Sequence, residues 1–93
     1  MTPQKIIATI EQYEQELAAL GVPRKRMDPN RTFASLSREE MLMHAHYLCS
    51  GVKEYALDLQ KQRKAGSHLT SVQLCMSFAG LYTLQELMDH TRS

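Results

Sequence analysis

The stretch LSREEM, residues 36–41, decides the fold because it marks where the longest helix begins. Ser37 can cap a helix N-terminus with its hydroxyl, and Glu40, three residues later, can return a hydrogen bond to that cap. Leu36 and Met41 flank this capping box as a hydrophobic staple. The sequence therefore predicts a helix that starts at residue 38.

The helix opened by this box is predicted to span residues 38–64. Lys61, Arg63 and Lys64 match the negative end of a helix dipole, and Gly66 can supply a left-handed cap. The main apolar stripe consists of Met41, Ala45, Leu48, Val52, Tyr55 and Leu59 and is widened by Leu42, Cys49 and Ala56. A second apolar group lies on the opposite side at about 100° per residue and consists of Met43, His46, Tyr47 and Leu57. A second apolar face predicts contact with another helix, a second protomer or a ligand.

An N-terminal helix is predicted over residues 3–20. Thr2 and Pro3 are typical of a helix start, and Gly21 with Pro23 indicates its end. The helix has one apolar face, formed by Ile6, Ile10, Tyr13, Leu17 and Leu20. Polar side chains, including Glu11, Glu14 and Glu16, are expected on the solvent-exposed side of the helix. Residues 21–37 form a connector to the next helix.

Two further helices are predicted after residue 66. The first, over 70–80, can be opened by a capping box of Thr70 and Gln73, and Gly80 ends or kinks it. Apolar residues lie on two of its faces, one formed by Val72, Cys75, Met76 and Ala79 and the other by Leu74, Phe78 and Leu81. A short last helix over 84–91 follows a third capping box, Thr83 with Glu86.

No segment shows the alternation of a strand, so we expect an all-α fold. The prediction is one domain over 1–93, a small antiparallel bundle of three main helices plus a short C-terminal helix. The doubled apolar faces favour a homo-oligomer. Its interface is expected to contain Met43, Tyr47, Leu57, Leu74 and Phe78.

Composition excludes several classes of protein. Of the 93 residues, 43% are hydrophobic and 23% charged, which is typical of a globular domain. The net charge of +1 argues against binding to extended nucleic acid, which needs a concentrated cationic face. No apolar run reaches the roughly 18 residues of a membrane span, so we expect no membrane partner and a cytoplasmic protein. Cys49 and Cys75 are interpreted as reduced, buried thiols.

The sequence contains no assembled catalytic or metal-binding motif. His44 and His46 are two residues apart on a helix, and therefore point about 160° away from each other. His68 and His90 have no His, Cys or acidic partner at a ligand spacing. Neither cysteine has an adjacent base, and there is no glycine-rich phosphate loop. We therefore expect no metal, no cofactor and no enzymatic activity.

The connector begins with GVPRKRMDPNR, residues 21–31, which carries four cations, Arg24, Lys25, Arg26 and Arg31, and one acid. Two hypotheses stay open. Solvated cations would keep the loop in water, whereas a long ordered loop between helices is often functional. In the second case the four cations would bind phosphates, and Tyr47 or Tyr13 would stack on a base.

The segment HLTSVQLCMSFAGLYTLQELMDHTR, residues 68–92, resembles the C-terminal ends of small phage-encoded helical proteins. The matching positions are His68, Leu69, Gln73, Gly80, Tyr82, Thr83, Glu86, His90 and Arg92. The resemblance covers about a quarter of the chain. It implies action in the host cytoplasm, either as an oligomeric sponge that captures a host signal nucleotide or as an antagonist that covers a host factor. The ligand motifs of the sponge proteins do not align with this sequence, so no ligand residue is carried over.

These observations favour a non-enzymatic helical protein that binds an anionic, nucleotide-like small molecule of host defence. The alternatives are a protein-binding inhibitor or regulator of a host factor and a structural oligomerisation module.

Overall fold

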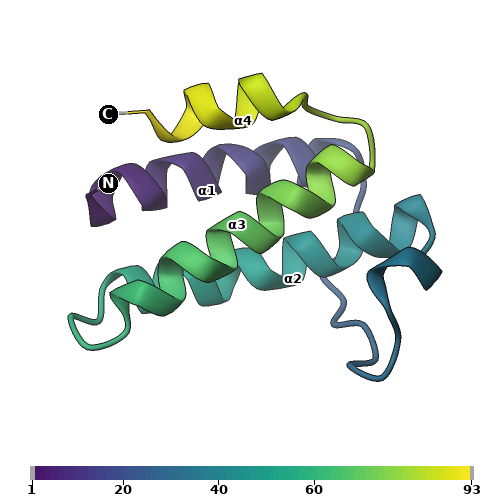
Figure 1. Ribbon diagram of the computed structural model, residues 1–93, viewed down its shortest axis with the longest axis horizontal. Coiled ribbons are helices and arrows are strands. Elements are labelled where there is room, and N and C mark those ends of the chain that lie inside the picture. Colours follow the sequence, from purple (N-terminus) through teal and green to yellow (C-terminus); the bar gives the residue numbers. More distant parts are fainter. Residues whose placement is uncertain (1, 93) are drawn as a thin grey trace.

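The computed structural model describes residues 2–92, which form four α-helices and no strand. The elements are α1 (Pro3–Ala19), a 3-10 turn η1 (Phe33–Ser35), α2 (Arg38–Ala56), α3 (Gln62–Phe78) and α4 (Leu84–Thr91). Figure 1 shows α2 and α3 as a helical hairpin, with α1 packed beside them and α4 running back along α1. The predicted all-α bundle is confirmed.

The first helix begins and ends as its sequence predicts. The Thr2 hydroxyl accepts a hydrogen bond from the Lys5 amide at 3.1 Å. At the other end Gly21 has a φ of 75°, and the amides of Gly21 and Val22 bond to the carbonyls of Ala18 and Leu17. This Schellman arrangement turns the chain into the connector. The buried face consists of Ile6, Thr9, Ile10, Tyr13, Glu14 and Leu17.

The capping box that opens α2 is present. The Glu40 amide donates to the Ser37 hydroxyl at 3.1 Å, and the Ser37 amide donates to the Glu40 carboxylate at 2.9 Å. The buried residues of α2 are Leu42, Ala45, His46, Cys49, Val52 and Ala56. This face is centred on the widened side of the predicted stripe, so that Met41, Leu48 and Tyr55 are only partly buried. His46, predicted on the opposite side of the helix, is buried as well.

The prediction of one helix over 38–64 is wrong, because a turn at residues 57–61 divides it. The Asp58 amide donates to the Tyr55 carbonyl, the Lys61 amide donates to the Asp58 carbonyl, and the Asp58 carboxylate accepts the Gln60 amide at 2.9 Å. The turn lets α3 fold back onto α2 and bury the apolar residues of both helices. Leu59, predicted in the core, is instead 86% exposed.

The start of α3 consequently differs from the prediction over 70–80. Gly66 lies inside the helix without a positive φ, so it is not a cap. The Thr70 hydroxyl donates to the Gly66 carbonyl within the helix, and Gln73 reaches towards α1. The predicted end is confirmed: Gly80, with a φ of 82°, follows the last turn, and the amides of Gly80 and Leu81 bond to the carbonyls of Ser77 and Met76.

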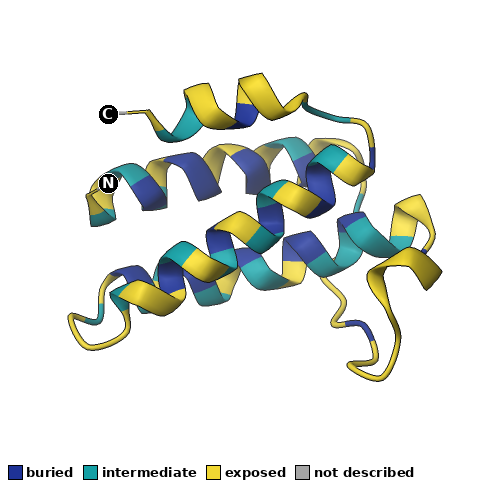
Figure 2. Ribbon diagram, viewed as in Figure 1, coloured by how far each residue is buried: buried dark blue, intermediate teal, exposed yellow. Residues whose placement is uncertain are grey.

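The core lies where α1, α2 and α3 meet, and Leu87 of α4 joins it (Figure 2). α4 starts at a capping box of Thr83 and Glu86, as predicted. Both cysteines lie in the core as free thiols, as the sequence indicated. Within residues 2–92, no helix combines the length and the apolar composition that crossing a membrane requires.

Candidate functional site

The connector is held against α1 and α2 by Arg24. Its guanidinium lies 2.6 Å from the Glu14 carboxylate of α1, and it also donates to the His46 carbonyl at 2.9 Å and the Ser50 hydroxyl at 3.1 Å. The His46 ring donates through Nδ1 to the Val22 carbonyl at 2.8 Å. These contacts fix the first half of the connector, so Arg24 serves the fold.

The second half of the connector is held by Arg31. Its guanidinium pairs with both oxygens of Glu40, at 2.6 and 3.2 Å, and donates to the Ser35 carbonyl. Because the Arg31 guanidinium donates to it and it accepts the Ser37 amide, the pKa of Glu40 falls to about 2. The second half therefore has its own anchor, which ties it to the capping box of α2.

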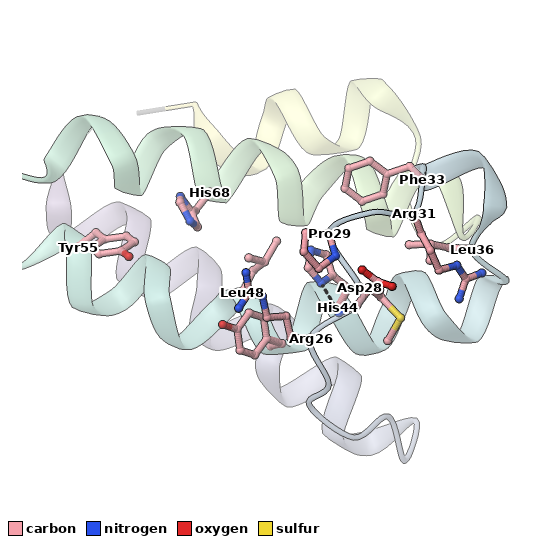
Figure 3. Close-up of a pocket in the computed structure, with 12 residues that line it drawn as sticks. Arg26, Asp28, Pro29, Arg31, Phe33, Leu36, His44, Leu48, Tyr55 and His68 are labelled. Carbon is pink, nitrogen blue, oxygen red and sulfur yellow. Dashed lines mark hydrogen bonds between the residues drawn. The ribbon is translucent and has the colours of Figure 1, made fainter.

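Between these anchors the connector bounds a pocket of about 470 Å³. Figure 3 shows Phe33 and Leu36 of the connector at one end of the pocket, and Tyr55 of α2 with His68 of α3 at the other. The remaining lining residues are Arg26, Met27, Asp28, Pro29, Arg31, His44, Tyr47 and Leu48. A volume of several hundred Å³ is the usual size for a site that binds a small molecule.

His44 is the central polar residue of the pocket wall. Its Nδ1 accepts the Met27 amide at 3.2 Å, which places the proton of the neutral ring on Nε2. Burial, and then the nearby Arg26 charge, lower the pKa of His44, so the ring is neutral at pH 7. The ring lies 6.0 Å from that of Tyr47 in a stacked arrangement and 6.1 Å from that of Phe33, edge to face. The pocket therefore has an aromatic wall with one N–H donor.

The opposite end of the pocket has a complementary polar group. The His68 Nδ1 donates to the Lys64 carbonyl at 2.9 Å, which leaves Nε2 of the neutral ring as an acceptor. The His68 ring packs against that of Tyr55, with centroids 5.1 Å apart. A ligand in the pocket can thus meet a donor at His44 and an acceptor at His68.

The structure brings some predicted site residues together and separates others. Arg26, Arg31 and Tyr47 line the pocket, whereas Lys25 is exposed beside it. Among residues 2–92, Lys25 and Arg26 form no ion pair, in contrast to Arg24 and Arg31. Tyr13 is not at the site: it is 0% exposed in the core, and its hydroxyl bonds to His90 at 2.7 Å.

Sequence reasoning missed most of the apolar and imidazole lining of the pocket. Phe33, His44 and His68 were not predicted at a site, because their proximity depends on the path of the connector and on the turn at 57–61. The one available signal was the position of His44 close to Tyr47 on α2. That spacing places the two rings on adjacent turns of a helix.

The predicted interface residues divide between different parts of the fold. Leu57 lies in the turn between α2 and α3, while Leu74 and Phe78 project from the last turns of α3. Met43 is partly buried and lines a smaller groove with Pro23 and Leu42. They therefore do not form one continuous face.

The two thiols are buried and lie outside the pocket. Burial raises the pKa of Cys49 to about 12 and that of Cys75 to about 11, so both stay protonated at neutral pH. Residues 2–92 contain no group of three or more His, Cys, Asp or Glu placed to hold a metal ion. The pocket lining itself combines cations, aromatic rings and two imidazoles.

No protein-family model, curated protein or solved structure matches this chain.

Proposed function

We propose that the protein binds a small anionic aromatic molecule of the nucleotide class in the connector pocket and does not convert it. The observation that carries this proposal is Arg26, a cation without an ion pair in residues 2–92, at a pocket walled by aromatic rings. A guanidinium is well suited to a phosphate because its N–H groups bind two oxygens at once.

The aromatic wall supplies the second part of the interaction. Tyr47 is 39% exposed, and stacking of a base on such a ring contributes roughly 1 to 3 kcal/mol. The His44 Nε2–H and the His68 Nε2 can then bond to the edge of the base as donor and acceptor. Charge, stacking and edge recognition together fit a nucleotide better than a simple anion.

The resemblance of residues 68–92 to phage-encoded proteins extends the proposal to a biological role. A protein that binds a nucleotide without turnover lowers the free concentration of that nucleotide. In a phage-infected cell the ligand would be a signal molecule of host defence, and the protein would act in the host cytoplasm as a sponge.

Isothermal titration calorimetry with a panel of linear and cyclic nucleotides tests the proposal. We expect saturable heat with at least one of them and a loss of affinity of about tenfold or more in Arg26→Gln, because a hydrogen bond to a charged group contributes roughly 1.5 to 3 kcal/mol. Lys5→Gln removes the same charge from α1, outside the pocket, and should bind as the wild type does. No heat with any nucleotide at high micromolar concentration would refute the proposal.

A second candidate function is the binding of a protein partner, and exposed apolar residues of α3 favour it. Leu74 and Phe78 lie one helical turn apart and are 45% and 70% exposed. Large apolar side chains grouped on a surface mark contact sites. A second copy of the chain, as in a homo-oligomer or a structural oligomerisation module, or a host factor would each cover them.

A further inference from the structure

The turn between α2 and α3 exposes more apolar surface than its fold requires. Leu57 and Leu59 are 75% and 86% exposed, the highest values among the large apolar side chains of the described residues. Figures 1 and 2 show this turn as an exposed loop at one end of the molecule. Neither leucine belongs to the core, so packing gives no reason for an apolar residue at either position.

Three cations directly follow the leucines: Lys61, Arg63 and Lys64. The ammonium groups of Lys61 and Lys64 lie 5.8 and 5.6 Å from the ring centroid of Tyr55, and within residues 2–92 none of the three cations forms an ion pair. All three are exposed and therefore able to meet an external anionic surface.

Helix electrostatics does not explain these cations. They stand at the start of α3, whose first turn contains no acid and whose N-cap residue, Lys61, makes no capping hydrogen bond. The N-terminal end of a helix carries a partial positive charge, which disfavours cations there. The sequence predicted these three cations at the C-terminal end of a helix over 38–64, where the helix dipole favours them. Because they lie at the N-terminal end of α3 instead, the dipole does not account for them.

The turn also differs in charge from the rest of the chain. Residues 57–64 contain three cations and one acid, whereas the remaining residues contain eight cations and nine acids. The acids next to the turn in the sequence are Glu54 and Asp58, and the three cations outnumber them. The long-range field therefore orients this end of the molecule towards an anionic surface.

The geometry points to a peripheral membrane contact. We propose that the 57–64 segment docks on an anionic lipid surface, with Leu57 and Leu59 inserted among the acyl chains and Lys61, Arg63 and Lys64 on the headgroups. Exposed apolar residues beside cations are the combination that binds such surfaces. Tyr55, one turn below, matches the preference of tyrosine for the headgroup level.

A fluid lipid interface fits this segment better than a protein does. A stable protein contact buries about 800 Å² on each partner, with matched shape, and a five-residue turn with two leucines cannot supply that area. Lipids close around an inserted side chain without a preformed cavity. The contact needs no membrane-spanning helix, so it is compatible with the absence of one in residues 2–92. Residues 57–64 do not line the connector pocket, although the neighbouring Tyr55 does.

Vesicle sedimentation tests the contact. We expect the full chain to bind vesicles of phosphatidylcholine with about one third phosphatidylserine, to bind phosphatidylcholine alone at least tenfold more weakly, and to dissociate as salt is raised. The Leu57→Ser, Leu59→Ser double variant should lose at least tenfold in partition coefficient. The matched control is Leu84→Ser, Met88→Ser, because these α4 residues are 64% and 54% exposed but lie among Glu86 and Asp89. The control should bind as the wild type does.

A fluorescence measurement reports insertion itself. The chain contains no tryptophan, so the Leu59→Trp variant carries a single indole probe in the turn, and the Leu84→Trp variant carries its control on α4. Anionic vesicles should shift the emission of the Leu59→Trp variant to the blue and should leave that of the Leu84→Trp variant unchanged.

Three results would overturn the proposal. The first is no binding of the wild type to anionic vesicles. The second is equal binding by the Leu57→Ser, Leu59→Ser variant. The third is a change in oligomeric state caused by that variant, which would assign the leucines to a protein contact.

Discussion

Glu14 is the residue at which three parts of the fold meet. Its carboxylate lies on α1, 2.6 Å from the guanidinium of Arg24 in the connector and 2.8 Å from the ammonium of Lys53 in α2. Burial alone would raise the pKa of this carboxyl, but hydrogen bonds from Lys53 and Arg24 outweigh burial and lower it. Glu14 therefore stays ionised and couples α1 to both neighbours.

Replacing Glu14 by Gln should lower the free energy of unfolding by about 1 to 2 kcal/mol at pH 7, because charge-assisted hydrogen bonds are lost and both cations are partly screened by water. A carboxyl group whose pKa is lowered in the folded protein stabilises the fold at pH values above the ordinary carboxyl pKa. This stabilisation is lost as the pH falls through the pKa of the folded state. The deficit of the variant, measured by urea unfolding, should accordingly shrink below about pH 4. Glu11→Gln is the control: it is exposed on the same helix and should change stability by less than about 0.5 kcal/mol. Equal deficits in the two variants would contradict this role for Glu14.

The sequence gives the charge of each side chain but does not predict which oppositely charged group it pairs with. Glu14 was assigned to the solvent-exposed side of α1 on helical periodicity, whereas it is buried under the connector. Arg24 consequently looked free for a ligand, although its charge is compensated within the fold. Such pairings join residues on different elements, and periodicity carries no information about them.

The short helix α4 is attached to the bundle by the buried Leu87 and by a set of polar contacts. The Tyr13 hydroxyl accepts from Gln73 of α3 at 3.2 Å and bonds to His90 of α4 at 2.7 Å. Just before α4, the Tyr82 hydroxyl donates to the Glu16 carboxylate. Burial, followed by this bond to the carboxylate, raises the pKa of Tyr82. The position of α4 on the bundle therefore depends on the direction in which the chain leaves α3 at Gly80.

Two glycine variants should have opposite effects. Gly80→Ala should destabilise by about 1 to 2 kcal/mol, because φ is 82° there and alanine is disfavoured in the left-handed region. Gly66→Ala lies inside α3, where an added Cβ meets no atom within 4 Å, and should stabilise by about 0.5 to 1 kcal/mol. Thermal unfolding followed by circular dichroism measures both. A lower midpoint for Gly66→Ala, or an unchanged one for Gly80→Ala, would contradict these local conformations.

The helix starts were largely predictable from sequence, and the turn at 57–61 was not. Capping boxes at Ser37 and Thr83 are local, so the residues that form them are adjacent in the chain. The turn contains neither Gly nor Pro and relies on Asp58, whose carboxylate can also be accommodated on a helix surface. What selects the turn is the burial of Ala65, Leu69 and Val72 against α2, a tertiary effect.

At the scale of the whole molecule, exposed apolar residues lie near both ends of α3. Leu57 and Leu59 precede its first residue, and Phe78 is its last, so the helix rise separates them by about 24 Å. The two ends of α3 therefore carry separate apolar surfaces. The first stands among cations and fits a lipid surface. Leu74 and Phe78 form the second and provide the apolar anchor that contact with a second copy requires.

If a second copy covers α3, the protein should sediment as a dimer or larger oligomer at micromolar concentration. The Leu74→Ser, Phe78→Ser variant should then be a monomer with unchanged helical content, because both side chains are exposed and neither belongs to the core. Sedimentation velocity over a range of concentrations makes the comparison, with Leu84→Ser, Met88→Ser as the control for loss of exposed apolar surface elsewhere. A monomeric wild type would leave the α3 face to a foreign protein. Dissociation of the α4 variant alone would show that the interface lies on α4. A monomeric wild type and dissociation of the α4 variant alone would each contradict association through α3.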